Sequence, residues 1–395
     1  MLPSARKKFN ASFTEEKYLQ FFHNLYDRFP YKIDFKVCET PVFIPAWLKE
    51  KLLQAGEDII DVICRKDFKK ITERAVPQNL QVPGEDENTV FLALDFGICI
   101  DEAGQISPQL IEMQGFASLH GYQHSLGKGY RTYFDIESGL SHLFNGLHDD
   151  SYEEFLRRTI VADHHTENVI LLEIEPEKQK TWVDFWITKE ITGVEPVCIS
   201  KIIKEGKDLF YEKGGRKIKI ERIYNRLIFD EFLLRKDLPV QWNITDEANV
   251  EWVSHPNWFF RISKYTLPYI KSEYVPETNF LHEVKSMPAD LENYVLKPLF
   301  SFAGSGVIFD VKEEDIKKIT DPENFILQRK VTYHPCIETP DIPAKFEMRL
   351  MYIWEKNRPR PTLVINLVRL SKGAMVGVNF NKGKSWVGGT VGYFE

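Results

Sequence analysis

The sequence predicts a mixed fold of the α+β or α/β class. Residues 90–116 have the two β-prone runs and central turn of a hairpin, and residues 168–200 alternate strand-like and helix-like segments. Residues 294–309 place a glycine-rich loop between two apolar runs. With 395 residues, 43% hydrophobic and 28% charged, the chain can support two or three hydrophobic cores.

The first 90 residues are expected to be mainly helical. Apolar residues recur at helical spacing in Phe13–Tyr18 and in Trp47–Leu53. We expect residues 1–90 to pack against the rest of the molecule as a platform.

The predicted hairpin carries three candidate metal ligands. We expect the chain to turn at residues 101–104, with Asp95 on the first strand and Glu112 and Gln114 on the second. Residues two apart on a strand point to the same face, so Glu112 and Gln114 present their oxygens side by side. A nucleotide-bound Mg²⁺ needs only one or two protein carboxylates besides phosphate and water. The alternative is an ordinary solvated face, but the flanking residues are apolar, which favours the metal.

Residues 151–250 are expected to form a small Rossmann-like unit with parallel strands. Residues 168–175 resemble a buried strand, residues 180–187 an amphipathic helix and residues 197–200 a second strand. The unit closes with a segment that contains Tyr224, Asn225 and Arg226. These three residues either contact substrate or serve in helix capping and surface pairing, and the sequence leaves both readings open.

The segment Tyr294–Phe309 has the composition of a phosphate-binding loop. Lys297 ends the first apolar run, and small residues follow it at Ser301, Gly304, Ser305 and Gly306. Backbone N–H groups of such a loop can surround phosphate oxygens, and the lysine adds a positive charge. The alternative is a β-hairpin that needs glycine only for its turn.

Two further strands are expected near the C-terminal end. Residues 345–354 and 362–371 have strand-like alternation and β-branched content, and they carry Arg349 and Arg369 respectively. Taken without any relatives, these arginines are expected to form a surface ion pair with Glu347 or another carboxylate.

Together the hairpin and the glycine loop resemble the ATP-grasp superfamily, and specifically the circularly permuted branch typified by glutathionylspermidine synthases. In that branch the metal-bearing strands precede the glycine loop, as they do here. The resemblance extends to Val253–Trp258, to Ile262–Tyr265 and to Phe325–Val331, which corresponds to the hinge that contacts adenine. It covers most of the chain from about residue 90. Ala93 replaces an arginine often found in the family, and Gln114 replaces its asparagine.

The resemblance implies a division of the chain and a set of site residues. Residues 91–150 would form the metal-bearing hairpin of a permuted ATP-grasp domain, residues 151–250 a Rossmann-like pre-ATP-grasp domain, and residues 251–395 the nucleotide-binding lobes. The residues expected to bind ATP are Lys264, Lys297, Ser301, Gly304, Ser305, Gly306, Gln328, Lys330 and Val331. Asp95, Glu112 and Gln114 would bind Mg²⁺, and Arg349 and Arg369 would be catalytic.

The implied activity is that of an ATP-dependent carboxylate-amine ligase. ATP would phosphorylate a small-molecule or peptidic carboxylate, and an amine would attack the acyl phosphate to form an amide. The departures at Ala93 and Gln114 put the substrate in doubt. They also allow a non-catalytic ATP-binding module that regulates a partner protein, and phosphorylation without ligation is a third, weaker reading.

Charge and cysteine content bear on partners and location. A net charge of −7 argues against general affinity for nucleic acid or anionic membranes, which requires clustered Lys and Arg. The five cysteines are scattered without a CxxC pair, so neither a disulfide framework nor structural zinc is expected. No secretory signal or membrane-spanning segment is expected, which predicts a cytoplasmic protein.

Overall fold

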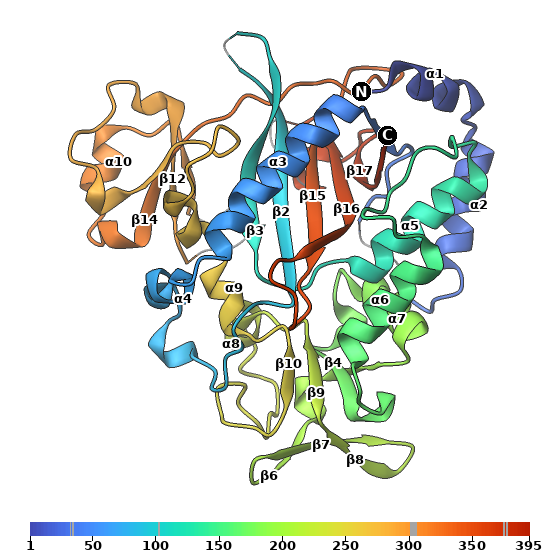
Figure 1. Cartoon of the computed structure of the whole chain (residues 1–395), viewed down its shortest axis with the longest axis vertical. Coiled ribbons are helices and arrows are strands. Elements are labelled where there is room, and N and C mark those ends of the chain that lie inside the picture. Colours follow the sequence, from blue (N-terminus) through green and yellow to red (C-terminus); the bar gives the residue numbers. More distant parts are fainter. Residues whose placement is uncertain (32, 34, 102, 301–305, 374–375, 377) are drawn as a thin grey trace.

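A five-stranded antiparallel sheet forms the centre of the molecule (Figure 1). The computed structural model describes residues 1–395 except 32, 34, 102, 301–305, 374–375 and 377. In order across the sheet, the strands are β17 (Gly388–Thr390), β16 (Thr362–Ser371), β15 (Lys345–Ile353), β2 (Phe91–Ile100) and β3 (Ile106–Gln114). The expected hairpin is therefore present, and the predicted strands near the C-terminal end are its sheet neighbours.

Helix α3 (Ala46–Ile63) covers one face of this sheet (Figure 1). Its buried residues recur at helical spacing and pack in one core with alternate residues of β2 and β15. This core includes Leu48, Leu52, Ile59, Leu94, Phe96, Met348 and Leu350. Because successive residues of a strand point to opposite faces, the positions between them, such as Asp95 and Arg349, face away from α3.

A second, four-stranded sheet is wholly parallel, in the order β10-β9-β4-β5. Its strands are β4 (Val169–Glu173), β5 (Glu195–Cys198), β9 (Arg222–Asn225) and β10 (Glu251–Val253). Apolar residues of α6 (Asp149–Val161) and α7 (Trp182–Thr192) pack with β4 in one core. The expected alternation of parallel strands and helices in this part of the chain is thus observed. A meander of β6 (Ile203–Glu205), β7 (Asp208–Lys213) and β8 (Arg216–Ile220) extends from it.

A small antiparallel sheet lies to the left of the central sheet in Figure 1. Its order is β11-β14-β12-β13, with β11 (Thr278–Phe280), β12 (Tyr294–Pro298), β13 (Ile308–Phe309) and β14 (Phe325–Arg329). It has its own apolar core, which includes Leu296, Val311 and Leu327. We call residues 278–330 the small lobe; it also contains α10 (Glu313–Lys317).

The N-terminal region is mainly helical, as expected. Besides α3 it contains α1 (Pro3–Ser12), α2 (Glu15–Tyr26), α4 (Phe68–Ile71) and one short strand, β1 (Val42–Ile44). Helices α1 and α2 share an aromatic core with α5 (His120–Tyr133). Strand β1 pairs in parallel with β18 (Gly392–Phe394), so segments from the two ends of the chain lie side by side. The remaining helices are α8 (Phe229–Leu234) and α9 (Asn257–Arg261).

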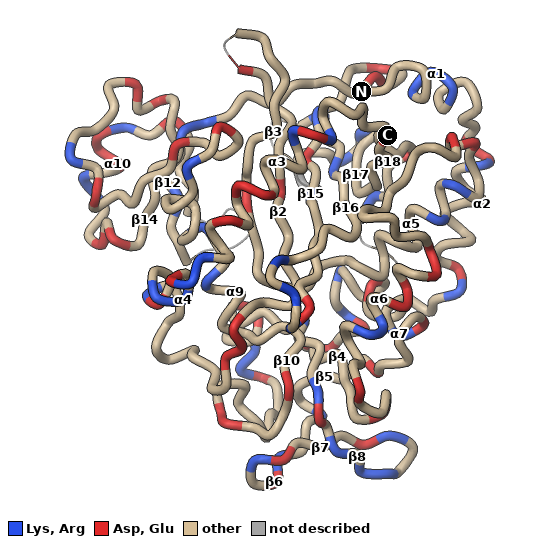
Figure 2. Tube along the Cα trace, viewed as in Figure 1, with Lys and Arg blue, Asp and Glu red and all other residues tan. Residues whose placement is uncertain are grey.

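Positive and negative residues are interspersed along the chain (Figure 2). The β6–β8 meander, for example, carries both signs and contains the ion pairs Lys217–Glu205 and Lys219–Asp208. All five cysteines are free thiols. Within the described ranges, none of the helices combines the length and hydrophobicity needed to span a bilayer.

Candidate functional site

Charged residues gather on the face of the central sheet that points away from α3. In the strand register, Asp95 lies opposite Arg349 on one side and Glu112 on the other. Glu347 lies opposite Arg369. Directly opposed residues of a sheet share a face, so four neighbouring strands, β3, β2, β15 and β16, place these five side chains together.

Asp95 is the centre of a buried ion-pair network. Its side chain is 3% exposed, and Arg349 binds it through two hydrogen bonds, Nε to Oδ1 at 2.6 Å and Nη2 to Oδ2 at 2.7 Å. Arg369 Nη2 donates to the same Oδ2 at 2.8 Å. Arg349 also donates to Ser118 Oγ at 2.7 Å. Burial by itself disfavours the carboxylate, but the two arginines outweigh it and lower the pKa of Asp95.

Glu347 completes the network on the adjacent strand. Arg369 Nη2 lies 2.8 Å from Glu347 Oε2, and the hydroxyl of Tyr333 donates to Oε1 of the same carboxylate. Burial raises the pKa of Glu347, and the neighbouring Asp95 charge acts in the same direction. The expected ion pair of an arginine with Glu347 is thus present, but the Glu347 carboxylate is buried rather than on the surface.

The absence of a side chain at Gly97 allows Tyr333 to reach Glu347. A Cβ at position 97 would lie 2.7 Å from Cε1 and 3.0 Å from Cζ of the Tyr333 ring. The tyrosine therefore crosses the backbone of β2 where only glycine leaves room.

We expect Gly97→Ala to displace Tyr333 and to lower the free energy of unfolding by about 1–3 kcal/mol, the usual range for overpacking. Gly139→Ala is the control, because no heavy atom outside its neighbours lies within 4 Å of the added Cβ. Urea denaturation of both variants provides the measurement. Equal stability of the two variants would contradict the expected clash.

Two lysines lie near this face. Lys297 is on β12 of the small lobe, and Lys264 begins the 3₁₀ helix η6 (Lys264–Tyr269). Burial and then the charge of Lys264 lower the pKa of Lys297 to about 8, while Glu112 and Glu347 act in the opposite direction. Burial likewise lowers the pKa of Lys264, opposed mainly by Glu112. The structure thus brings the predicted lysines to the predicted acidic strand.

Gln328 holds the lysine of the small lobe in place. Lys297 Nζ donates to Gln328 Oε1 at 2.5 Å, and Gln328 Nε2 donates to Thr278 Oγ1 at 2.9 Å. Gln328 is only 3% exposed. Because both ends of the buried Gln328 amide are hydrogen-bonded, its side chain has little rotational freedom. The Lys297 ammonium is therefore held in one orientation before any ligand binds.

Glu112 and Gln114 fit a hard divalent cation. Both are half-buried, and within the described part of the chain neither side chain makes a hydrogen bond or ion pair. Their oxygens are ligands that Mg²⁺ accepts. Asp95 differs from them, because both of its oxygens already accept hydrogen bonds from arginine. Its assignment as a metal ligand stays a prediction, and its observed role is to hold Arg349 and Arg369.

The other predicted residues are placed as follows. Ser301, Gly304 and Ser305 lie outside the described residues, and Gly306 is exposed with φ of +70°. The Lys330 ammonium binds the carboxylate of Asp310 and the carbonyl of Glu292, both within or beside the small lobe. Val331, which follows Lys330, is half-buried.

Arg226 has a structural partner. It forms a buried ion pair with Asp184 of α7 and also donates to the carbonyl of Ser118 at 3.0 Å. The sequence left open whether this segment contacts substrate or serves in capping and ion pairing. For Arg226 the structure shows an ion pair, which lies in the interior rather than on the surface. Sequence reasoning missed Tyr333, which lies in a segment without periodicity and carries no recognisable motif.

Comparisons with known proteins support the fold. No protein-family model matches the chain, and no curated protein is similar to it in sequence. Among solved structures, the chain is similar to a glutathione synthetase-like effector from Globodera pallida, with a TM-score of 0.60 and 11% identity over 96% of each chain. The chain therefore shares the overall fold of a glutathione synthetase-like protein. At this identity the likeness is one of fold alone.

Proposed function

We propose that this protein is an ATP-dependent carboxylate-amine ligase. The observation that carries the proposal is the convergence of Lys264 and Lys297 with Glu112, next to the arginines held by Asp95. Two neighbouring, half-buried lysines repel each other, and a bound polyphosphate relieves that repulsion. The glutathione synthetase-like fold supports the same class of reaction, although it does not identify substrates.

The residues of the site would have distinct tasks. ATP with Mg²⁺ supplies the phosphoryl group that activates a carboxylate as an acyl phosphate. Lys264 and Lys297 would bind its phosphates, and Glu112 with Gln114 would hold the cation. Arg369, whose side chain is 37% exposed, would offset the repulsion between carboxylate and phosphate. An amine would then displace phosphate and form the amide.

The low pKa of Lys297 predicts a pH dependence of nucleotide binding. Lys297 loses its charge as the pH rises through about 8, so Mg-ATP affinity should fall above that pH. In Lys297→Arg the guanidinium stays charged, so this fall should disappear. Calorimetric titrations between pH 7 and pH 9 measure the effect. If Mg-ATP affinity falls to the same extent in Lys297→Arg, the pH dependence comes from a group other than Lys297.

Product formation tests the reaction class. We expect phosphate release from ATP that depends on both an acid and an amine, across a panel of small and peptidic substrates. Transfer of ¹⁸O from the carboxylate into the released phosphate would identify the acyl phosphate and exclude simple phosphorylation. Mg-ATP binding without phosphate release across the panel would instead indicate a nucleotide-binding module.

A further inference from the structure

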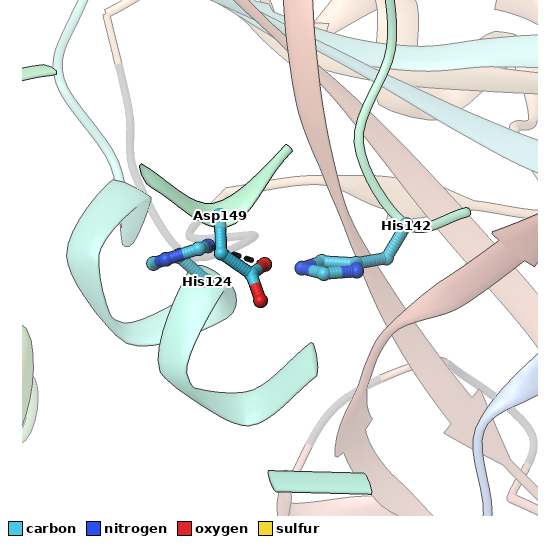
Figure 3. A group of neighbouring side chains, drawn as sticks. All are labelled: His124, His142 and Asp149. Atoms are coloured by element: carbon cyan, nitrogen blue, oxygen red, sulfur yellow. Dashed lines mark ion pairs between the residues drawn. The ribbon is translucent and has the colours of Figure 1, made fainter. Parts of the chain in front are cut away.

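A second group of polar side chains lies between α5, α6 and the segment that connects them. His124 comes from α5, His142 from the connection, and Asp149 is the first residue of α6. Figure 3 shows the Asp149 carboxylate directed to the space between the two imidazole rings. None of these residues takes part in the lysine and arginine site described above.

One ring nitrogen of each histidine in this group is buried and without a hydrogen-bond partner among the described residues. His124 and His142 are 1% and 4% exposed. Nδ1 of His124 and Nε2 of His142 have no hydrogen-bond partner among the residues that the structure describes. One ligand atom of each of the three residues lies within 4.8 Å of the others, and His124 Nδ1 is 4.0 Å from Asp149 Oδ1. Two buried ring nitrogens without partners are costly for a fold unless something binds them.

The surroundings set the protonation state that a metal ligand requires. His124 Nε2 lies 2.9 Å from Glu153 Oε1, which also accepts from Lys128 Nζ at 2.9 Å. With the proton on Nε2, the lone pair of Nδ1 points to the centre of the group. Metal-binding histidines commonly donate their other ring N–H to a carboxylate in this way.

We propose that His124 Nδ1, His142 Nε2 and the Asp149 carboxylate bind a divalent transition-metal ion, with Zn²⁺ as the best fit. Imidazole and carboxylate are ligands of Zn²⁺, and three protein ligands leave a fourth tetrahedral position for water. Bonds of about 2.1 Å place tetrahedral ligands about 3.4 Å apart. The Asp149 side chain is 44% exposed, so it can rotate toward the two imidazoles, and its solvent side gives the ion a path of entry.

Metal titration of the full chain tests this site. After treatment with a chelator, we expect the protein to bind one equivalent of Zn²⁺ by calorimetry, and Co²⁺ to give the visible absorption of a tetrahedral complex. Asp149→Ala should weaken binding at least tenfold. Asp150→Ala is the matched control, because it removes a neighbouring, exposed carboxylate from the same first turn of α6 and should leave affinity unchanged.

Two further variants separate metal binding from folding. Glu153→Gln keeps the size of the side chain that orients His124 and should weaken Zn²⁺ binding about 10–100-fold, as for other carboxylates behind a metal-bound histidine. His142→Ala should abolish the Co²⁺ spectrum. Circular dichroism confirms that each variant is folded. Absence of stoichiometric binding in the wild-type chain, or equal affinity in folded Asp149→Ala and Asp150→Ala, would overturn the assignment.

Discussion

Replacing Asp95 by alanine is expected to lower the free energy of unfolding by about 3–5 kcal/mol, because it leaves charges buried without a partner. Arg349 and Arg369 both bind this carboxylate, and the side chain of Arg349 is only 11% exposed. Glu347 pairs with Arg369 and is itself buried, so it cannot replace Asp95 at Arg349 without moving. Guanidinium denaturation of wild-type and variant measures the difference.

The pairing of Asp61 with Arg360 provides the control for this prediction. Their side chains are 68% and 40% exposed, so Asp61→Ala should change stability by no more than about 1 kcal/mol. Acid denaturation gives an independent check, because the pKa of Asp95 is lowered in the folded protein. Its contribution is complete above the unfolded carboxyl pKa of about 3.9 and is lost as the pH falls through the lower folded value. Equal losses of unfolding free energy in Asp95→Ala and Asp61→Ala would show that Asp95 contributes no more to stability than an exposed carboxylate.

Local signals in the sequence predicted the elements of the fold well. The hairpin of β2 and β3 turns where expected, because Gly104 adopts a φ of +79° there and its N–H donates to the Asp101 carbonyl at 3.0 Å. Two strands of the parallel sheet, β4 and β5, were likewise predicted from short apolar runs separated by an amphipathic helix. The order of strands in the central sheet could not be predicted, since β2 pairs with a strand some 250 residues later and no local pattern encodes that register.

The difference between local patterns and long-range strand pairing also explains which site residues could be predicted. A two-residue period placed Glu112 and Gln114 on one face, and the structure leaves both free of hydrogen bonds within its described residues. The binding of two arginines to Asp95 depends on how three strands pair, so no local pattern favours Asp95 over Glu347 as the partner of Arg349. Tyr333 was missed for a related reason, because its position depends on the space above Gly97.

The group of His124, His142 and Asp149 had no sequence signal at all. The two histidines are 18 residues apart and belong to different elements, without the close spacing of a recognised metal motif. Their proximity results from the packing of α5 against the connection before α6, where a Cβ on Gly127 would lie 2.3 Å from the His142 ring. Sites of this kind become visible only when tertiary packing is known.

Lys297→Ala and Glu112→Ala are each expected to lower ATP-dependent turnover about a hundredfold or more, which corresponds to the loss of roughly 3 kcal/mol of transition-state stabilisation per missing group. In the proposed site, Lys297 would supply a positive charge to the phosphates, and Glu112 would supply the charged ligand of the cation. Lys317→Ala and Glu313→Ala are matched controls, because these residues form an exposed pair on α10 of the small lobe. Initial rates with the acid and amine identified by the panel measure the effect.

The two site variants differ in a way that separates the proposed reaction from nucleotide binding alone. Lys297→Ala removes a ground-state contact with phosphate, so it should weaken Mg-ATP binding as well as lower turnover. Glu112→Ala should raise the Mg²⁺ concentration needed for half-maximal rate, because Gln114 then holds the cation without a carboxylate beside it. Neither variant should lose stability to the degree of Asp95→Ala, since Glu112 is half-buried without an ion pair among the described residues. Near-normal turnover in both folded variants would refute the ligase assignment for these residues.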